Sequence, residues 1–166
     1  WINLVTDGLP ALALSVDPYP KGLMDKHPRQ KNEPLMTKAR TFNIFYVSSL
    51  IAAGVLGLFV WGLMTYQNDI AHVQTIAFTS LVLFELVRAY FVRAESGVPL
   101  LSNVWLLGAV LVSFGLQLAV VYTPLQYLFG TVALSLSDWA SIAIVTFMLF
   151  TFNIIGLAVQ RRFGDK

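Results

Sequence analysis

Residues 1–11 read Trp1-Ile2-Asn3-Leu4-Val5-Thr6-Asp7-Gly8-Leu9-Pro10-Ala11. Within this apolar stretch Asn3, Thr6 and Asp7 are spaced i, i+3, i+4, so a helix would present all three polar side chains on one face. Gly8 and Pro10 follow at once, and a proline cannot donate a hydrogen bond to the preceding turn. A broken helix inside a membrane is tolerated only where it is buried in protein or lines a wet cavity. Free carbonyls beside three oxygen-bearing side chains therefore predict half of a cation site.

The composition of the whole chain is that of a membrane protein. Of its 166 residues, 57% are hydrophobic and 12% are charged, whereas soluble domains contain about 25% charged residues. A helix needs roughly 20 apolar residues to cross a bilayer, and four runs reach that length. We predict an all-α, polytopic transmembrane helical bundle. Residues 1–16 form the trailing part of a discontinuous helix, and residues 17–41 form a loop. The region at 42–166 contains four spans, at about 44–66, 70–91, 104–122 and 139–159.

The positive charges predict how these spans are oriented. All 11 Lys and Arg residues fall on one side of the membrane if the four spans alternate in direction. Six lie at 21–40, Arg88 and Arg93 lie at the end of the second span, and three lie in the tail at 161–166. The positive-inside rule then makes the loop at 17–41 and the carboxy terminus cytoplasmic.

Glu85 is a second carboxylate within apolar sequence, inside the span predicted at 70–91. A charge near the bilayer centre is costly, so it has a partner or a purpose. Arg88 follows three residues later and could neutralise Glu85 in an intrahelical ion pair. A cation ligand and an ion-paired structural residue are both open interpretations of Glu85 from the residues alone.

Other polar residues have simpler structural interpretations. Asn103 precedes the third span and looks like a helix cap, and Ser137 could cap the last helix. Asp17 belongs to the charged loop, where we expect it to be solvated. His72 has no second histidine or cysteine at metal-ligand spacing, so we interpret it as an ordinary polar residue. The chain has no cysteine and therefore no disulfide or thiolate metal site.

Two segments resemble a known family. Residues 3–14, N-L-V-T-D-G-L-P-A-L-A-L, resemble the sixth transmembrane helix of type II P-type cation-transporting ATPases, most closely the calcium pumps of the sarcoplasmic-reticulum type and their prokaryotic relatives. Residues 74–86 look like the eighth helix of the same pumps. Because the first residue is Trp and no signal segment precedes the motif, we expect the chain to be the carboxy-terminal piece of a longer protein.

The resemblance implies a membrane fragment of an ATP-driven cation pump, most closely one for Ca²⁺. When the roles of the family's residues are carried over to the matching positions, Asn3 serves one ion site, Thr6 serves the other and Asp7 bridges both. Glu85 supplies a further oxygen. Ca²⁺ takes 6–8 oxygen ligands, so the remaining ligands belong to helices upstream of Trp1. Mg²⁺ and ATP are implied for the parent chain and not for this fragment, which has no P-loop and no D-K-T-G phosphorylation motif. No catalytic residue is predicted within it.

The partners that the resemblance implies are the upstream transmembrane helices and the cytoplasmic phosphorylation domain of the same parent protein. The lipid bilayer is the other expected partner, nucleic acid is not one, and the expected location is multi-pass in the cell membrane. Two alternatives stay open. The pump could carry Mn²⁺, Na⁺, K⁺ or H⁺, although the V-T-D-G-L-P wording favours Ca²⁺. Outside this class, the chain could be a non-enzymatic membrane scaffold or channel subunit.

Overall fold

The fold is known from a computed structural model of the chain. It describes residues 1–2, 4, 8–17, 38–67, 69–95 and 102–164. These residues form six helices and no strand: α1 Leu9–Ser15, α2 Lys38–Thr65, α3 Ile70–Glu95, α4 Val104–Tyr122, α5 Gln126–Phe129 and α6 Leu136–Gly164. The predicted all-α class is confirmed.

Four of these helices are long and apolar enough to cross a membrane, as predicted. The candidate spans are Arg40–Thr65, Ile70–Phe91, Val104–Tyr122 and Leu136–Gly156. The third agrees with its prediction at both ends, whereas the first and last begin three or four residues earlier than predicted. The last begins earlier because Ser135 and Asp138 form a capping box, in which Asp138 Oδ2 accepts from Ser135 N at 2.7 Å and Asp138 N donates to Ser135 Oγ at 3.3 Å. The predicted cap, Ser137, is therefore wrong by two residues.

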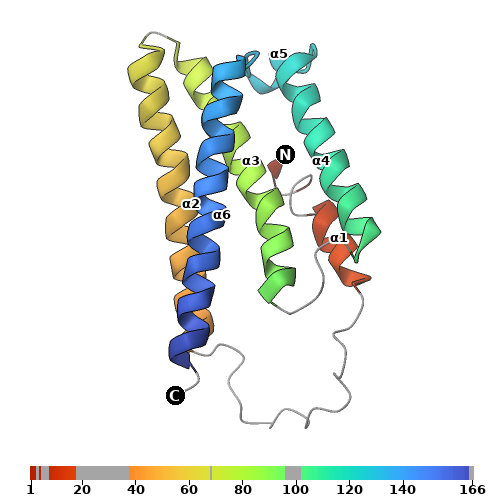
Figure 1. The fold of residues 1–166 in the computed structure, drawn as a ribbon. Helices are drawn as coiled ribbons and strands as arrows, with labels where there is room; N and C mark the ends of the chain where they lie inside the picture. The colour runs from red at the N-terminus through yellow and green to blue at the C-terminus, as the bar shows by residue number, and fades with distance from the viewer. Residues whose placement is uncertain (3, 5–7, 18–37, 68, 96–101, 165–166) are drawn as a thin grey trace.

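The helices form one bundle with α3 at its centre (Figure 1). Helices α2, α3 and α6 pack against one another, α4 packs on α3, and the short α1 packs on α4. Of the candidate spans, α3 has the largest buried share, 44% against 11–28% for the other three. The buried core links four elements through Leu58, Ile76, Phe84, Val121, Leu134 and Ile142. The other long helices keep large apolar side chains exposed, among them Leu56, Leu111 and Phe147.

Glycine allows α2 to approach its neighbours closely at two positions. A Cβ on Gly54 would lie 3.0 Å from Leu149 and 3.1 Å from Phe84, and one on Gly62 would lie 3.1 Å from Val73. Larger residues at either position would force the helices apart. The neighbouring small residues of α2, including Gly57, face outward, where a Cβ on Gly57 meets nothing within 4 Å.

The chain starts inside the bundle and not at one of its ends. In Figure 1 the amino terminus lies near the middle of α3 and α4, and α1 runs from there toward the end of the bundle that holds the carboxy terminus. At 1.5 Å per residue, the seven residues of α1 rise about 10 Å, against about 30 Å for the hydrocarbon core of a bilayer. Helix α1 by itself therefore covers only part of the membrane thickness.

Candidate cation site

The backbone around the polar motif is not a regular α-helix. Ile2, Leu4 and Gly8 have π-helical backbone, in which the turn is one residue wider than in an α-helix, and α-helical geometry begins at Leu9. Pro10 lies in the first turn of α1, where its missing N–H costs nothing. The described backbone therefore changes from π-helical to α-helical geometry between Gly8 and Leu9, and the expected break at the motif stays a prediction. Three of the predicted ligands, Asn3, Thr6 and Asp7, lie outside the described residues.

Polar side chains in the bundle interior hold the start of this segment. Trp1 Nε1 donates to Gln117 Oε1 of α4 at 3.3 Å, and Gln117 Nε2 donates to Thr79 Oγ1 of α3 at 3.1 Å. Gln117 and Thr79 are fully buried. The Trp1 ring also packs edge-on against Phe129, with centroids 5.1 Å apart. Because a buried amide needs its hydrogen bonds satisfied, Gln117 fixes the first residue against α3 and α4.

Asn103 holds the other end of the segment. Its Oδ1 accepts from Leu106 N at 2.9 Å, which makes it the N-cap of α4 as predicted. Its Nδ2 donates to Ala13 O at 2.8 Å and to Asp17 Oδ1 at 3.0 Å. One buried amide thus caps α4 and binds the last turn of α1.

Asp17 is not the solvated loop residue that we expected. Arg93, at the end of α3 and 2% exposed, donates from Nε to Asp17 Oδ2 at 2.8 Å and from a terminal nitrogen to Ser102 Oγ at 2.7 Å. The hydrogen bond from Arg93 lowers the pKa of the Asp17 carboxyl, with help from the Asn103 amide and against the opposing effect of burial. Asp17 is therefore charged at neutral pH and ties α1 to α3.

Glu85 lies half-buried on α3, one turn before Arg88. Within the described part of the chain, no ion pair within 4 Å joins Arg88 to Glu85 or to any other carboxylate. The structure therefore does not form the intrahelical pair that would have explained Glu85. Its role as a cation ligand stays a prediction, since its position relative to Asn3, Thr6 and Asp7 is outside the described residues.

No ready-made metal cluster occurs among the residues that the structure describes, where no three His, Cys, Asp or Glu side chains converge. The predicted ligands Asn3, Thr6 and Asp7 lie outside the residues searched, so the predicted cation site stays a prediction. The contacts of Trp1, Ala13 and Asp17 fix both ends of that motif in the bundle.

A second polar cluster lies at the opposite end of the bundle. Asp138 is fully buried and accepts hydrogen bonds from Tyr66 Oη, His72 Nε2 and both the N and Oγ of Ser135, at 2.7–2.8 Å. The rings of Tyr66 and His72 stack with centroids 4.1 Å apart. His72 is thus a partner of Asp138, a role that its sequence position did not reveal. The sequence did contain one signal for the role of Asp138. It lies three residues after Ser135, and this spacing matches a capping box.

The fold defines a class: an all-helical protein with four helices able to span a membrane and a short amino-terminal helix anchored by polar side chains of the bundle. Comparison with known families then gives a specific assignment. The family of cation transporting ATPase carboxy-terminal regions matches residues 1–157, and the chain belongs to this family.

Among curated relatives, the chain is similar to a calcium-transporting ATPase of Bacillus subtilis, with 37% identity over 158 residues, 90% of this chain and 18% of the relative. It is 30% identical over 181 residues to calcium-transporting ATPase 1 of Bacillus cereus, covering 95% of this chain and 20% of the relative. It is 34% identical over 143 residues to calcium-transporting ATPase type 2C member 1 of Pongo abelii, covering 83% of this chain and 16% of the relative. The chain therefore spans at most a fifth of the length of these relatives.

Proposed function

We propose that this chain is the carboxy-terminal membrane part of an ATP-driven calcium pump. The observation that carries the proposal is the anchoring of Trp1, Ala13 and Asp17 in the bundle on either side of the polar motif, within the region that matches the cation-transporting ATPase family. The relatives named above are calcium-transporting ATPases, which favours Ca²⁺ as the cargo. An irregular helix lined by oxygen atoms suits a hard cation that sheds its water shell during passage.

In this proposal Asn3, Thr6 and Asp7 bind the ion as it passes, and Glu85 supplies a further oxygen. Asp7 carries the only formal charge of the motif and would dominate the attraction for a divalent cation. The remaining ligands of a site with 6–8 oxygens come from water and from upstream helices of the parent protein.

The energy for transport comes from parts of the parent protein beyond this chain. A cytoplasmic phosphorylation domain would use ATP and Mg²⁺ to form an aspartyl phosphate, and upstream transmembrane helices would complete the ion path. Helices α2, α4, α5 and α6 then act mainly as a scaffold, and α3 also contributes Glu85. This division of labour agrees with the absence of a nucleotide-binding motif from the sequence.

The proposed orientation has the loop at 17–41 and the carboxy terminus in the cytoplasm, within the cell membrane. Arg40, Arg88 and Arg93 lie at one end of the bundle, the end that also holds the carboxy terminus (Figure 1). The connections at the other end contain no Lys or Arg. This asymmetry satisfies the positive-inside rule.

ATP hydrolysis and ion uptake by the full-length protein in sealed vesicles test the proposal. We expect micromolar Ca²⁺ to stimulate hydrolysis, with Ca²⁺ uptake into vesicles whose cytoplasmic face is outward. Stimulation by Mn²⁺, Na⁺, K⁺ or H⁺ instead would keep the pump and discard calcium. A well-folded preparation that hydrolyses no ATP with any of these ions would leave a membrane scaffold or channel subunit as the function.

A further inference from the structure

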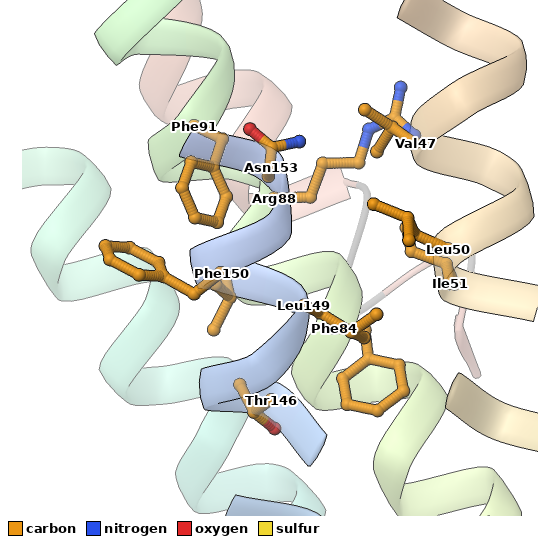
Figure 2. Close-up of a pocket in the computed structure, with 11 residues that line it drawn as sticks. Val47, Leu50, Ile51, Phe84, Arg88, Phe91, Thr146, Leu149, Phe150 and Asn153 are labelled. Carbon is orange, nitrogen blue, oxygen red and sulfur yellow. The ribbon is translucent and has the colours of Figure 1, made fainter. Parts of the chain in front are cut away.

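A groove between α2, α3 and α6 is separate from the proposed cation site. Its walls are largely apolar and include Val47 and Ile51 of α2, Phe84 of α3 and Leu149 of α6. Toward the basic end of the bundle the groove widens into a polar mouth lined by Arg40, Arg88 and Asn153. Figure 2 shows the Arg88 side chain extending from α3 toward Val47 of α2, above the apolar walls.

Two polar side chains in this mouth lack the partners that such groups normally have. Asn153 is 5% exposed, and its Oδ1 has no hydrogen bond. Arg88 forms no ion pair with any described carboxylate, and none of the described residues that line the groove is a carboxylate. Buried polar atoms without a partner are rare in folded proteins and call for an explanation. The Arg88 guanidinium therefore makes the mouth complementary to an anion.

The polar side chains of the mouth lie near the ends of the candidate spans, where lipid headgroups meet acyl chains. Arg88 and Asn153 each lie three residues before the end of their candidate spans, at Phe91 and Gly156. Three residues of helix correspond to about 4.5 Å. Arg40 is the first residue of its own span. Taken as the hydrocarbon core, the candidate spans put the polar mouth near the headgroup boundary of one leaflet and the apolar part level with the acyl chains.

The two parts of the groove also differ in volume, and the polar mouth is the larger. The polar mouth has a volume of about 220 Å³, whereas the apolar part has about 30 Å³. A cavity needs at least about 10–15 Å³ to hold one water molecule, so the mouth has room for a hydrated or esterified phosphate. The apolar part is too small to enclose a hydrocarbon chain, so a chain would lie against its walls from the bilayer side.

We propose that this groove binds an anionic glycerophospholipid of the leaflet at the basic end. The Arg88 guanidinium donates to the phosphodiester oxygens, for which its planar fork of donors is suited. Asn153 Oδ1 accepts a hydrogen bond from a headgroup hydroxyl, and one acyl chain lies along Val47, Phe84 and Leu149. The bound lipid fills the gap between α2, α3 and α6 and so stabilises the scaffold.

Native mass spectrometry of the full-length protein tests this site. The probes are phosphatidylglycerol and phosphatidylcholine with the same acyl chains, added separately to detergent-solubilised protein. We expect at least one tightly retained phosphatidylglycerol per protein and weaker retention of phosphatidylcholine. Arg88→Gln should weaken phosphatidylglycerol binding about tenfold, as expected for the loss of a charge-assisted hydrogen bond. Arg88→Lys should restore part of it, because the charge returns without the fork.

Asn153→Leu provides a second variant, since it removes the headgroup acceptor and leaves all charges in place. It should weaken phosphatidylglycerol binding severalfold without changing the retention of phosphatidylcholine. Thr151→Val is the matched control, because Thr151 lies on the same helix with an exposed side chain that bonds only to the carbonyl of Phe147. The melting temperature of each variant shows that it is folded.

Three results would overturn the proposal. Equal retention of both lipids by the wild-type protein would show that the groove does not select an anion. Unchanged phosphatidylglycerol binding in Arg88→Gln, with the protein folded, would show that the groove is covered by another part of the parent protein. Displacement of the lipid by glycerol 3-phosphate alone would identify a site for a soluble phosphate instead of a lipid.

Discussion

Asp7 and Glu85 are the two carboxylates of this chain that the proposed function assigns to the ion. Asp7 follows Asn3 and Thr6 in the sequence and directly precedes Gly8, after which the described backbone changes from π-helical to α-helical geometry. Glu85 comes from a regular helix, α3, whose hydrogen bonds satisfy its own carbonyl groups. Only the irregular segment can offer both side-chain and backbone oxygens, so the two carboxylates are not equivalent.

We predict that Asp7→Asn in the full-length pump is more damaging than Glu85→Gln. Asp7→Asn should weaken the apparent Ca²⁺ affinity by about tenfold or more, or abolish Ca²⁺-dependent phosphorylation from ATP, since affinity depends strongly on ligand charge. Glu85→Gln should give a smaller loss of affinity or fewer ions per cycle. Phosphorylation as a function of free Ca²⁺ measures both.

Wild-type affinity in Asp7→Asn would exclude Asp7 as a ligand. Unchanged affinity and stoichiometry in Glu85→Gln would make Glu85 a structural residue, although not one paired with Arg88. Asp69→Asn serves as the charge-matched control, because Asp69 is exposed in the turn before α3.

Single residues differ in how far the sequence reveals their roles. Asn103 was identified as a helix cap because capping depends on neighbours close in sequence. Its bonds to Ala13 and Asp17, 90 and 86 residues away, could not be predicted from that pattern. Asp17 was misjudged for the same reason, since Arg93 reaches it only after α1 and α3 are packed in one bundle.

At the scale of elements, α1 depends on its neighbours more than any long helix does. Seven residues are too few for a stable isolated helix, and α1 has two buried residues of its own, Pro10 and Ala13. Its position follows from α4, against which it packs, and from the bonds that Asn103 and Arg93 make to its last turn and to Asp17. These contacts therefore set where the preceding ion motif lies.

We predict that Asn103→Ala loosens α1 and lowers the affinity of the pump for Ca²⁺. The variant loses the cap of α4, worth about 1 kcal/mol, and the hydrogen bonds to Ala13 and Asp17, worth about 1 kcal/mol each. If about half of this loss appears in ion binding, the apparent affinity falls about tenfold. The Ca²⁺ concentration for half-maximal ATPase activity is the measurement.

Gln67→Ala is the control for this variant, since Gln67 is an exposed amide in the turn between α2 and α3. It should leave the Ca²⁺ dependence unchanged. If Asn103→Ala lowers the melting temperature but not the Ca²⁺ affinity, the anchoring of α1 does not position the ion motif.

The elements themselves were largely predictable, because four apolar runs of sufficient length fix four spans whatever their packing. The start of α6 was not, since Leu136 and Ser137 precede the apolar run and only the Ser135–Asp138 capping box makes them helical. The short helix α5 was also missed. Its four residues lie in an apolar connection with no helical periodicity, and it ends at Gly130 in the left-handed conformation.

At the scale of the whole molecule, polar clusters fasten the two ends of the bundle. At the basic end, Asp17, Arg93 and Asn103 join α1, α3 and α4. At the opposite end, Asp138 joins α6 to Tyr66 beyond α2 and to His72 of α3. Apolar packing between helices is weakly directional in a bilayer, so these clusters supply much of the specificity of helix arrangement.

We predict that Asp138→Asn destabilises the protein while leaving the cation site intact. The variant replaces an acceptor of four hydrogen bonds by an amide, so the donors of Tyr66, His72 and Ser135 compete for one remaining oxygen. A buried donor that is left without an acceptor costs about 1–3 kcal/mol. The melting temperature of the full-length protein should therefore fall by several degrees, whereas its Ca²⁺ affinity below that temperature should not change.

Asp69→Asn separates this effect from a general loss of negative charge. Asp69 is exposed and accepts one hydrogen bond, from His72 N at 3.0 Å, so its replacement should cost at most about 1 kcal/mol. An Asp138→Asn protein as stable as Asp69→Asn would mean that apolar packing alone holds this end of the bundle. A shift in Ca²⁺ affinity without a loss of stability would instead mean that the two ends are coupled through α3, the one helix that contributes to both polar clusters.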